Sequence, residues 1–324
     1  MEAEVLKSIK NQLVERRQKL QTSARQLNDN HDLYNLLREV DSALERIDHG
    51  SFGKCEICHD EIEKDRLLVD PLIKVCLDHL TYDQQKALES DIEYAVKIQR
   101  GLLPQNNIKL NGWDFSYYYN PAGPVSGDYC DLIPNKDGSF SFVLGDVSGK
   151  GIAASLMMSH LHALIRSLLL FDLPVNEIVN KANRLFCESA VSSNYATLVF
   201  GRAKPNGETE ISIAGHNPPL LMQGGDVISL KATGVPVGLF CESKYDVHKI
   251  NLTRGDSLLL YSDGLTESAL NDIEYGEKRV KDQFLKAAGQ PPKSIIKMLL
   301  SDHKEYLNDT KPSDDVTIAV IKRL

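Results

Sequence analysis

The chain has 324 residues, of which 42% are hydrophobic and 25% charged, and its formal net charge is −8. This is the composition of a globular protein of about two domains, and the acidic excess argues against a protein that coats nucleic acid, because neutralising phosphates needs clustered Lys and Arg. No apolar run approaches the roughly 20 residues that cross a bilayer, and the first residues lack the apolar segment of a secretory signal. We therefore expect a cytoplasmic protein with no membrane segment and no direct contact with nucleic acid.

The first part of the chain is expected to form a helical hairpin. Residues 1–48 contain neither proline nor glycine, and their apolar side chains recur at helical spacing in two stripes. The turn formers LNDNHD separate the stripes, so the hairpin is expected to bend near residues 28–30. A compact segment follows from about residue 50 to 80, and we take the hairpin and this segment together as a first domain, 1–82.

The compact segment carries a candidate zinc site with the spacing C-x2-C-x17-C-x2-H. Two close pairs of nitrogen or sulfur ligands can close a tetrahedron around Zn²⁺. Four protein ligands leave no position for water, so one structural Zn²⁺ is expected, whose binding energy holds a segment too small to fold on its own core. His59 competes as the fourth ligand, but only His79 completes the second close pair. The predicted ligands are Cys55, Cys58, Cys76 and His79.

The residues around this site resemble the DksA/TraR-type zinc finger. The likeness covers about residues 35–80 and includes GSFGKCEIC, where a helix leads into the first cysteine pair. His79 stands where that family usually has a fourth cysteine, a substitution that Zn²⁺ accepts. Some members act on RNA polymerase through acidic residues at the hairpin tip; Asp29-x-x-Asp32 is similar to that tip, although Tyr34 stands where a small residue is expected. The resemblance implies, as an alternative function, a transcription-associated protein that binds RNA polymerase.

A second helical pattern follows, from about residue 81 to 103, where Pro104 stops it, and we assign residues 83–107 as a linker. Its heptad pattern predicts pairing with a second copy of the same helix, which gives a two-fold homodimer. Gln99 in this seam weakens the pairing and permits two packing states. A helix that packs on its own domain explains three heptads equally well. The seam consists of Leu88, Ile92, Ala95, Gln99 and Leu102.

From residue 108 the apolar period changes to two, which indicates strands. Strand-like runs occur at WDFSYYYN, SFSFVLGD, YATLVFGRA, TEISIAG, DVISL, SLLLYSD and DVTIAVI, and helical patterns lie at about 152–171, 175–191, 276–288 and 292–307. Strands in blocks with helices in pairs predict an α+β fold over 108–324, in which two antiparallel sheets pack face to face and helices flank them. Single cysteines are scattered through this region and are expected to be reduced thiols: Cys130, Cys187 and Cys241.

The same region places aspartates next to glycine or at the end of an apolar strand. Carboxylates at buried strand ends are costly to desolvate unless they are paired, hydrogen-bonded or bound to a cation, although a single one is more often a cap of a turn or helix. Together they predict convergent oxygen ligands, which suit Mg²⁺ or Mn²⁺ rather than Zn²⁺. The residues are Asp128, Asp146, Asp263, Asp314 and Asp315.

The segment GDVSGKG at 145–151 opens a helical pattern. It lacks the spacing of a P-loop, and no GxGxxG motif follows a strand. Its glycines permit a turn that exposes the Val147 carbonyl and the start of the helix to a cation or a phosphate.

Further motifs occur in a fixed order: IQRGLLP, SGDYCD, GDVSGKGIAASLMMS, AGHNPPLL, GVPVGL, YSDGLTES and DDVTIAVI. Together they resemble the SpoIIE/RsbU-type branch of the metal-dependent Ser/Thr protein phosphatases (the PPM superfamily), over about residues 90–324. The resemblance implies a two-sheet β-sandwich flanked by helical pairs and two Mn²⁺ or Mg²⁺ ions. It also implies a STAS-type anti-anti-sigma phosphoprotein as substrate in a partner-switching pathway. We expect the N-terminal zinc domain to control the phosphatase. A metal-activated water needs no protein nucleophile, so Ser148 and Cys130 are not expected to be covalent catalysts.

The resemblance also implies a role for each acidic residue. Asp146 is the carboxylate that bridges the two metal ions, and the Val147 carbonyl is a further ligand. Asp128 and Asp263 are the other inner ligands; in DDVT, Asp314 aligns with the usual ligand, and Asp315 is the second choice or a support. His216 in AGHNPP either acts as an acid, positions the substrate or is a structural turn residue, and it stays outside the catalytic set. That set is Asp128, Asp146, Asp263 and Asp314.

Overall fold

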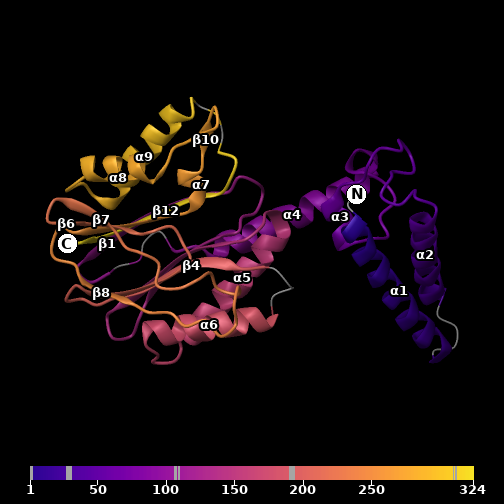
Figure 1. Ribbon diagram of the computed structural model, residues 1–324, viewed down its shortest axis with the longest axis horizontal. Helices are drawn as coiled ribbons and strands as arrows, with labels where there is room; N and C mark the ends of the chain where they lie inside the picture. Colours follow the sequence, from indigo (N-terminus) through magenta and orange to yellow (C-terminus); the bar gives the residue numbers. More distant parts are fainter. Residues whose placement is uncertain are drawn as a thin grey trace. The chain divides into compact units, whose positions relative to one another are not determined.

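The computed structural model describes residues 3–26, 31–105, 108, 110–189, 194–308, 310 and 312–324. They fall into two compact units, Met1–Asp91 and Ile92–Leu324. Figure 1 shows the elements of both units in chain order. The boundary lies within the helix α4 (Tyr82–Leu102), which starts at a capping box: the Thr81 hydroxyl accepts from Gln84 N at 3.3 Å, and Gln84 Oε1 accepts from Thr81 N at 3.0 Å.

The N-terminal unit is built on an antiparallel helix pair, α1 (Ala3–Gln26) and α2 (His31–Asp48) (Figure 1). The two predicted apolar stripes face each other, because Ile9 and Leu13 of α1 lie in one core cluster with Val40 and Leu44 of α2. The helical hairpin is therefore confirmed, while its predicted bend at 28–30 lies outside the described residues. The segment that follows contributes two short helices, α3 (Lys64–Val69) and η1 (Leu77–His79).

The C-terminal unit contains two five-stranded antiparallel sheets in its described residues. The first has the order β1 (Trp113–Asn120), β12 (Val316–Arg323), β9 (Ser257–Tyr261), β6 (Leu220–Gln223) and β7 (Asp226–Ser229). The second has the order β2 (Asp128–Pro134), β3 (Phe140–Val147), β4 (Ala196–Ala203), β5 (Glu208–Ala214) and β8 (His248–Asn251). A separate pair of short strands is formed by β10 (Ala269–Leu270) and β11 (Ile273–Glu274).

Helices cover the outer face of each sheet (Figure 1). The sheet of β2 carries α5 (Gly151–Leu168) and α6 (Val175–Ser189); the sheet of β1 carries α8 (Glu277–Lys286) and α9 (Pro292–Tyr306). The helix α7 (Asp263–Thr266) is a single turn after β9. None of the described helices combines the length and the apolar character that spanning a bilayer requires.

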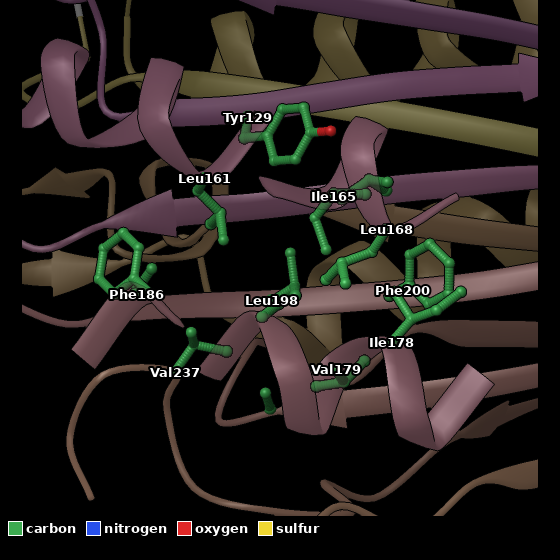
Figure 2. Packing of buried hydrophobic residues seen from close by; sticks show 14 of the residues in the cluster. Tyr129, Leu161, Ile165, Leu168, Ile178, Val179, Phe186, Leu198, Phe200 and Val237 are labelled. Carbon is green, nitrogen blue, oxygen red and sulfur yellow. The ribbon is translucent and has the colours of Figure 1, made fainter. Parts of the chain in front are cut away.

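Alternation along the strands explains the layers. In β4, Leu198 and Phe200 pack on the helices, whereas Val199 between them faces the opposite sheet. Figure 2 shows the helix-facing cluster, in which Leu168 of α5 and Ile178 of α6 are drawn next to Phe200. The predicted α+β class, with two antiparallel sheets flanked by helices, is confirmed.

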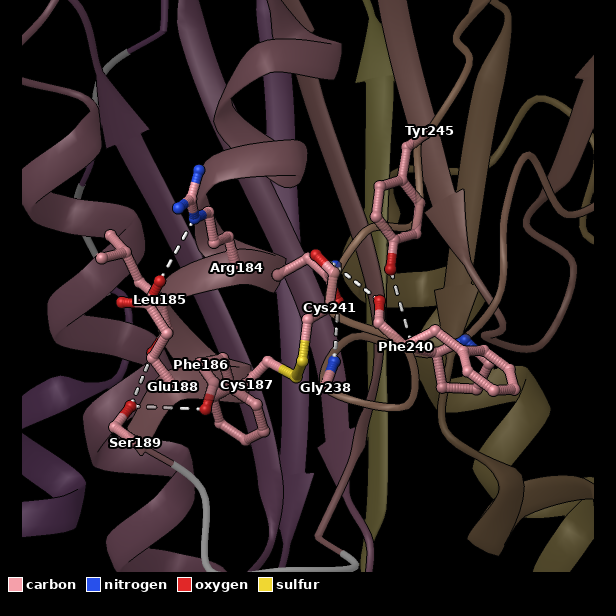
Figure 3. The surroundings of a disulfide bond; sticks show 12 residues. Arg184, Leu185, Phe186, Cys187, Glu188, Ser189, Gly238, Phe240, Cys241 and Tyr245 are labelled. Atoms are coloured by element: carbon pink, nitrogen blue, oxygen red, sulfur yellow. Dashed lines mark hydrogen bonds and ion pairs between the residues drawn. A yellow bond between two sulfur atoms is a disulfide. The ribbon is translucent and has the colours of Figure 1, made fainter.

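One prediction about the cysteines is wrong. Cys187 near the end of α6 and Cys241 in the segment between β7 and β8 form a disulfide, with Cα atoms 5.5 Å apart (Figure 3). Asn183 holds the same segment, because its Oδ1 accepts from Gly238 N at 2.8 Å and its Nδ2 donates to Phe240 O at 3.0 Å. The two cysteines are 54 residues apart, and the packing of α6 brings them together. Cys130 is a buried free thiol, as expected.

Candidate functional site

The predicted aspartates gather at one end of the two sheets. Asp128 opens β2 directly opposite Asp146 near the end of β3. Asp263 follows β9, and Asp314 and Asp315 precede its neighbour β12. A hydrogen bond from the Thr317 hydroxyl of β12 to Asp128 Oδ2 joins the two sheets at this end. The strand-end positions noted in the sequence therefore share one region of the fold.

Two glycines permit the close approach of these segments. A Cβ on Gly127 would lie 2.9 Å from the Val147 carbonyl oxygen and 3.1 Å from Asp146 Oδ1. A Cβ on Gly264 would lie 2.0 Å from the backbone oxygen of Asp315. Any side chain at either position would displace the backbone or the carboxylate beside it. This explains why glycine flanks aspartate in both SGD and SDG.

Asp315 and Asp314 have different surroundings. Asp315 Oδ1 accepts from Ala122 N at 2.7 Å, while its Oδ2 accepts from the Ser126 hydroxyl at 2.7 Å and from Gly127 N at 3.0 Å. Asp314 Oδ1 accepts a hydrogen bond from Asp315 N at 2.9 Å, and its Oδ2 forms an ion pair with the ammonium group of Lys150. Asp315 therefore holds the loop before β2 in place. Asp314 has one oxygen that contacts only the lysine ammonium group, which a metal ion could replace.

Burial and mutual repulsion dominate the electrostatics of this region. Burial, followed by the charges of Asp263 and Asp314, raises the pKa of Asp146 to about 8. Burial and the charge of Asp146 raise the pKa of Asp128 well above its ordinary range, and burial and Asp314 raise that of Asp263. A cation bound between such carboxylates stabilises their ionised forms and offsets their mutual repulsion. The donors are all oxygens, so the residues fit Mg²⁺ or Mn²⁺.

The described aspartates do not form a closed metal cage. Among the described residues, the group whose ligand atoms all lie within 4.8 Å of one another is the zinc cluster, and the aspartates do not form such a group. The structure thus brings the predicted carboxylates into one region, where their charges affect one another, but it does not bring their oxygens within the distance of ligands to a single ion.

The sequence did not predict how the loop before β2 is held. Gln99 of α4 is 5% exposed, and its side chain donates to Ser126 O at 2.7 Å and accepts from Ser126 N at 3.0 Å. The Ser126 hydroxyl in turn bonds Asp315 and accepts from Asp128 N at 2.9 Å. Gln99 therefore packs on its own unit, and its prediction as a seam residue between two helices is wrong. A polar residue at an apolar heptad position was the signal that pointed to such a contact.

His216 lies behind the candidate site. Its Nδ1 lies 2.7 Å from the hydroxyl of Thr197, the residue opposite Asp146 in the β3–β4 register. Burial lowers the pKa of His216 to about 4, so the ring is neutral at pH 7. Its Nε2 has no partner among the described residues. A ring that is neutral at pH 7 argues against His216 as the acid, and the choice between substrate positioning and a structural role stays open.

The zinc ligands come from two turns of the N-terminal unit. A short antiparallel bridge, Lys54 with Glu61, encloses Cys55 and Cys58, and η1 spans the interval from Cys76 to His79. His79 Nδ1 lies 3.2 Å from Cys76 Sγ and 3.9 Å from Cys55 Sγ, and the Sγ atoms of Cys58 and Cys76 are 3.7 Å apart. A tetrahedron with Zn–S bonds of about 2.3 Å has edges of about 3.8 Å, so the spacing fits Zn²⁺. His59 takes a left-handed turn (φ 63°) and lies outside the cluster.

Comparison with known families gives two matches. The family model for Stage II sporulation protein E (SpoIIE) matches residues 136–324, which is more than half of the chain. The model of the prokaryotic dksA/traR C4-type zinc finger matches residues 50–78, the segment that contains the three cysteine ligands.

Individual proteins resemble the chain over a longer stretch. Phosphoserine phosphatase RsbU of Bacillus subtilis is 27% identical over 246 residues, which cover 74% of this chain and 72% of that protein. The SiaA-PP2C domain of Pseudomonas aeruginosa superposes with a TM-score of 0.66 at 20% identity, over 74% of this chain and 98% of that domain. The structure of the RsbU and RsbW domains of Rv1364c from Mycobacterium tuberculosis has a TM-score of 0.57 at 28% identity, over 66% of this chain and 62% of that one.

Proposed function

This chain belongs to the Stage II sporulation protein E (SpoIIE) family and is a metal-dependent serine/threonine protein phosphatase, and we propose that its substrate is a STAS-type anti-anti-sigma phosphoprotein of a partner-switching pathway. The class of substrate is supported by the likeness to RsbU and to RsbP of Bacillus subtilis, both named phosphoserine phosphatases. Of these, RsbP is matched over 45% of its length. The STAS type is carried by the family resemblance of the ordered motifs.

The observation that carries the catalytic proposal is the convergence of oxygen donors with raised pKa values at one end of the sandwich. The residues proposed to hold two Mn²⁺ or Mg²⁺ ions are Asp128, Asp146, Asp263, Asp314 and the carbonyl of Val147. Asp315, whose oxygens are taken by the loop before β2, serves as their support. Two bound cations supply an activated water near neutral pH and neutralise charge on the phosphoryl oxygens.

The chain's own residues prepare this site without a covalent nucleophile. The Ser148 hydroxyl accepts a hydrogen bond from Tyr195 N at 3.0 Å and is therefore committed to the backbone. Cys130 is buried, and burial raises the pKa of its thiol far above neutrality. Asp146 must lose its proton to bind a cation. Because its pKa is raised to about 8, we expect metal binding at neutral pH to release that proton.

We further propose that the zinc unit controls the phosphatase unit. Its ligand set leaves no coordination position free, which suits a structural Zn²⁺ rather than a second catalytic one.

The alternative, a protein that binds RNA polymerase, depends on the hairpin tip, and Asp29 of that tip lies outside the described residues. No feature of the described residues favours that alternative.

The catalytic proposal is tested with purified full-length protein, p-nitrophenyl phosphate and added Mn²⁺. Asp146→Asn removes the charge of the proposed bridging ligand, so we expect activity to fall by roughly 10²-fold or more. Asp172→Asn, at an exposed carboxylate remote from the site, is the matched control and should retain activity. Full activity in Asp146→Asn, or in metal-free buffer, would refute the assignment.

The substrate proposal needs a separate measurement. Phosphorylated STAS-domain proteins from the same cell are incubated with the Mn²⁺-loaded protein, and loss of phosphate is followed by mass spectrometry. We expect at least one of them to be dephosphorylated, and Asp146→Asn to leave it phosphorylated. An enzyme that hydrolyses p-nitrophenyl phosphate but none of the STAS proteins would overturn the substrate proposal alone.

A further inference from the structure

One basic side chain reaches the aspartate cluster. Lys150 Nζ lies 2.7 Å from Asp314 Oδ2 and donates to Ser313 O at 3.1 Å. In the described part of the chain, no other ion pair is made by the five aspartates of the site. The charge of Lys150 partly opposes the rise in the pKa of Asp146 and of Asp263, so its field extends over the cluster.

The surroundings of Lys150 are open to solvent. Gly149 and Gly151 flank it with φ values of +99° and +73°, and a Cβ built on either would meet no atom within 4 Å. The Lys150 side chain is 63% exposed, and its partner Asp314 is 40% exposed. An ion pair this exposed contributes little stability, so moving the ammonium group away from Asp314 costs little free energy.

The ammonium and a divalent cation have the same target. Asp314 is one of the proposed metal ligands, and one of its carboxylate oxygens is the atom that Lys150 contacts. A metal ion bound to that oxygen would displace the ammonium group, which would then lie beside the metal site without an ion-pair partner. A phosphoryl group that carries up to two negative charges is a natural partner for it.

We propose that Lys150 is a tethered cation with two positions: it neutralises Asp314 while the metal site is incompletely filled, and it binds a phosphoryl oxygen of the substrate once a metal ion has taken Asp314. This inference rests on the proposed phosphatase function. It assigns to Lys150 a direct contact with the substrate, and it makes metal loading and phosphate binding depend on one side chain.

The test compares Lys150→Met and Lys150→Arg with the wild type in two assays on the full-length protein. In calorimetric titration with Mn²⁺ alone, loss of the competing ammonium should tighten binding on the order of fivefold, the size of one exposed ion pair. With saturating Mn²⁺, inorganic phosphate should inhibit Lys150→Met roughly tenfold more weakly, because a charge-assisted hydrogen bond is lost. Lys150→Arg should restore both values, and Lys181→Met, at an exposed lysine of α6, should change neither.

The two effects have opposite signs, which a general structural defect in the loop would not produce. If either the Mn²⁺ affinity or the inhibition by phosphate is the same in Lys150→Met as in the wild type, the inference is overturned while the phosphatase function stands. A wild-type protein that binds no Mn²⁺ overturns the proposed function and this inference together.

Discussion

Asp314 and Asp315 are adjacent in the chain, and their carboxylates have different partners. Asp315 accepts three hydrogen bonds from the loop before β2, two of them from backbone N–H groups. Asp314 bonds the next backbone N–H and an exposed lysine. The first residue shapes the site, and the second is free to exchange its cation.

This difference predicts unequal costs of truncation. Asp315→Ala leaves Ala122 N and Gly127 N without their acceptor, so we expect the free energy of unfolding to fall by roughly 2 kcal/mol or more. Asp314→Ala removes a half-exposed ion pair and should change it by about 1 kcal/mol or less. Urea denaturation of the metal-free variants measures both. Equal losses of stability in the two variants would contradict this division of roles between Asp314 and Asp315.

The raised pKa of Asp146 predicts how the metal-free protein responds to pH. The folded carboxyl holds its proton up to about pH 8, whereas the unfolded one loses it near pH 4. The stability that this group contributes is therefore present at low pH and is lost as the pH rises through about 8. The melting temperature of the metal-free protein should fall between about pH 4 and 8 and level off above pH 8, less steeply in Asp146→Asn, and Mn²⁺ should restore it most at the upper end. A flat profile in the wild type would show that Asp146 is not perturbed.

At the scale of elements, α6 and the segment between β7 and β8 are joined in two ways. The disulfide Cys187–Cys241 and the amide of Asn183 hold the same stretch. That stretch includes Val237, which bridges Ala196, and Ala196 pairs with Val147 beside the candidate site. The packing of α6 is thus connected through two strand pairings to a proposed metal ligand.

Closing a loop of 54 residues restricts the unfolded chain and stabilises the fold by on the order of 4 kcal/mol. Protein purified without reductant should therefore melt at a higher temperature than the same protein treated with a phosphine reductant. The double variant Cys187→Ser/Cys241→Ser should melt like the reduced protein and show no further response to reductant. Mass spectrometry that finds both thiols free in the unreduced wild type would contradict the disulfide.

At the scale of the whole molecule, the sequence predicted the features that arise from residues close together in the chain, namely the strand region and the zinc cluster. The change of apolar period near residue 108 marked the start of the sandwich, and the spacing of Cys55, Cys58, Cys76 and His79 predicted a cluster that the fold assembles. The partners of Gln99 and Cys187 were missed, because they lie 27 and 54 residues away and only tertiary packing brings them near. A periodic pattern relates residues a few positions apart, so it cannot predict contacts between residues this far apart in the chain.

The proposed activity depends on two divalent cations held by the acidic residues at the end of the sandwich. Crystals of the full-length protein grown with Mn²⁺, with diffraction data collected at the manganese absorption edge, would locate such cations. We expect two anomalous peaks in the space lined by Asp128, Asp146, Asp263 and Asp314, one of them beside the carbonyl of Val147, with Lys150 Nζ moved away from Asp314. Manganese peaks elsewhere, or none in this space at saturating Mn²⁺, would contradict the proposed metal site.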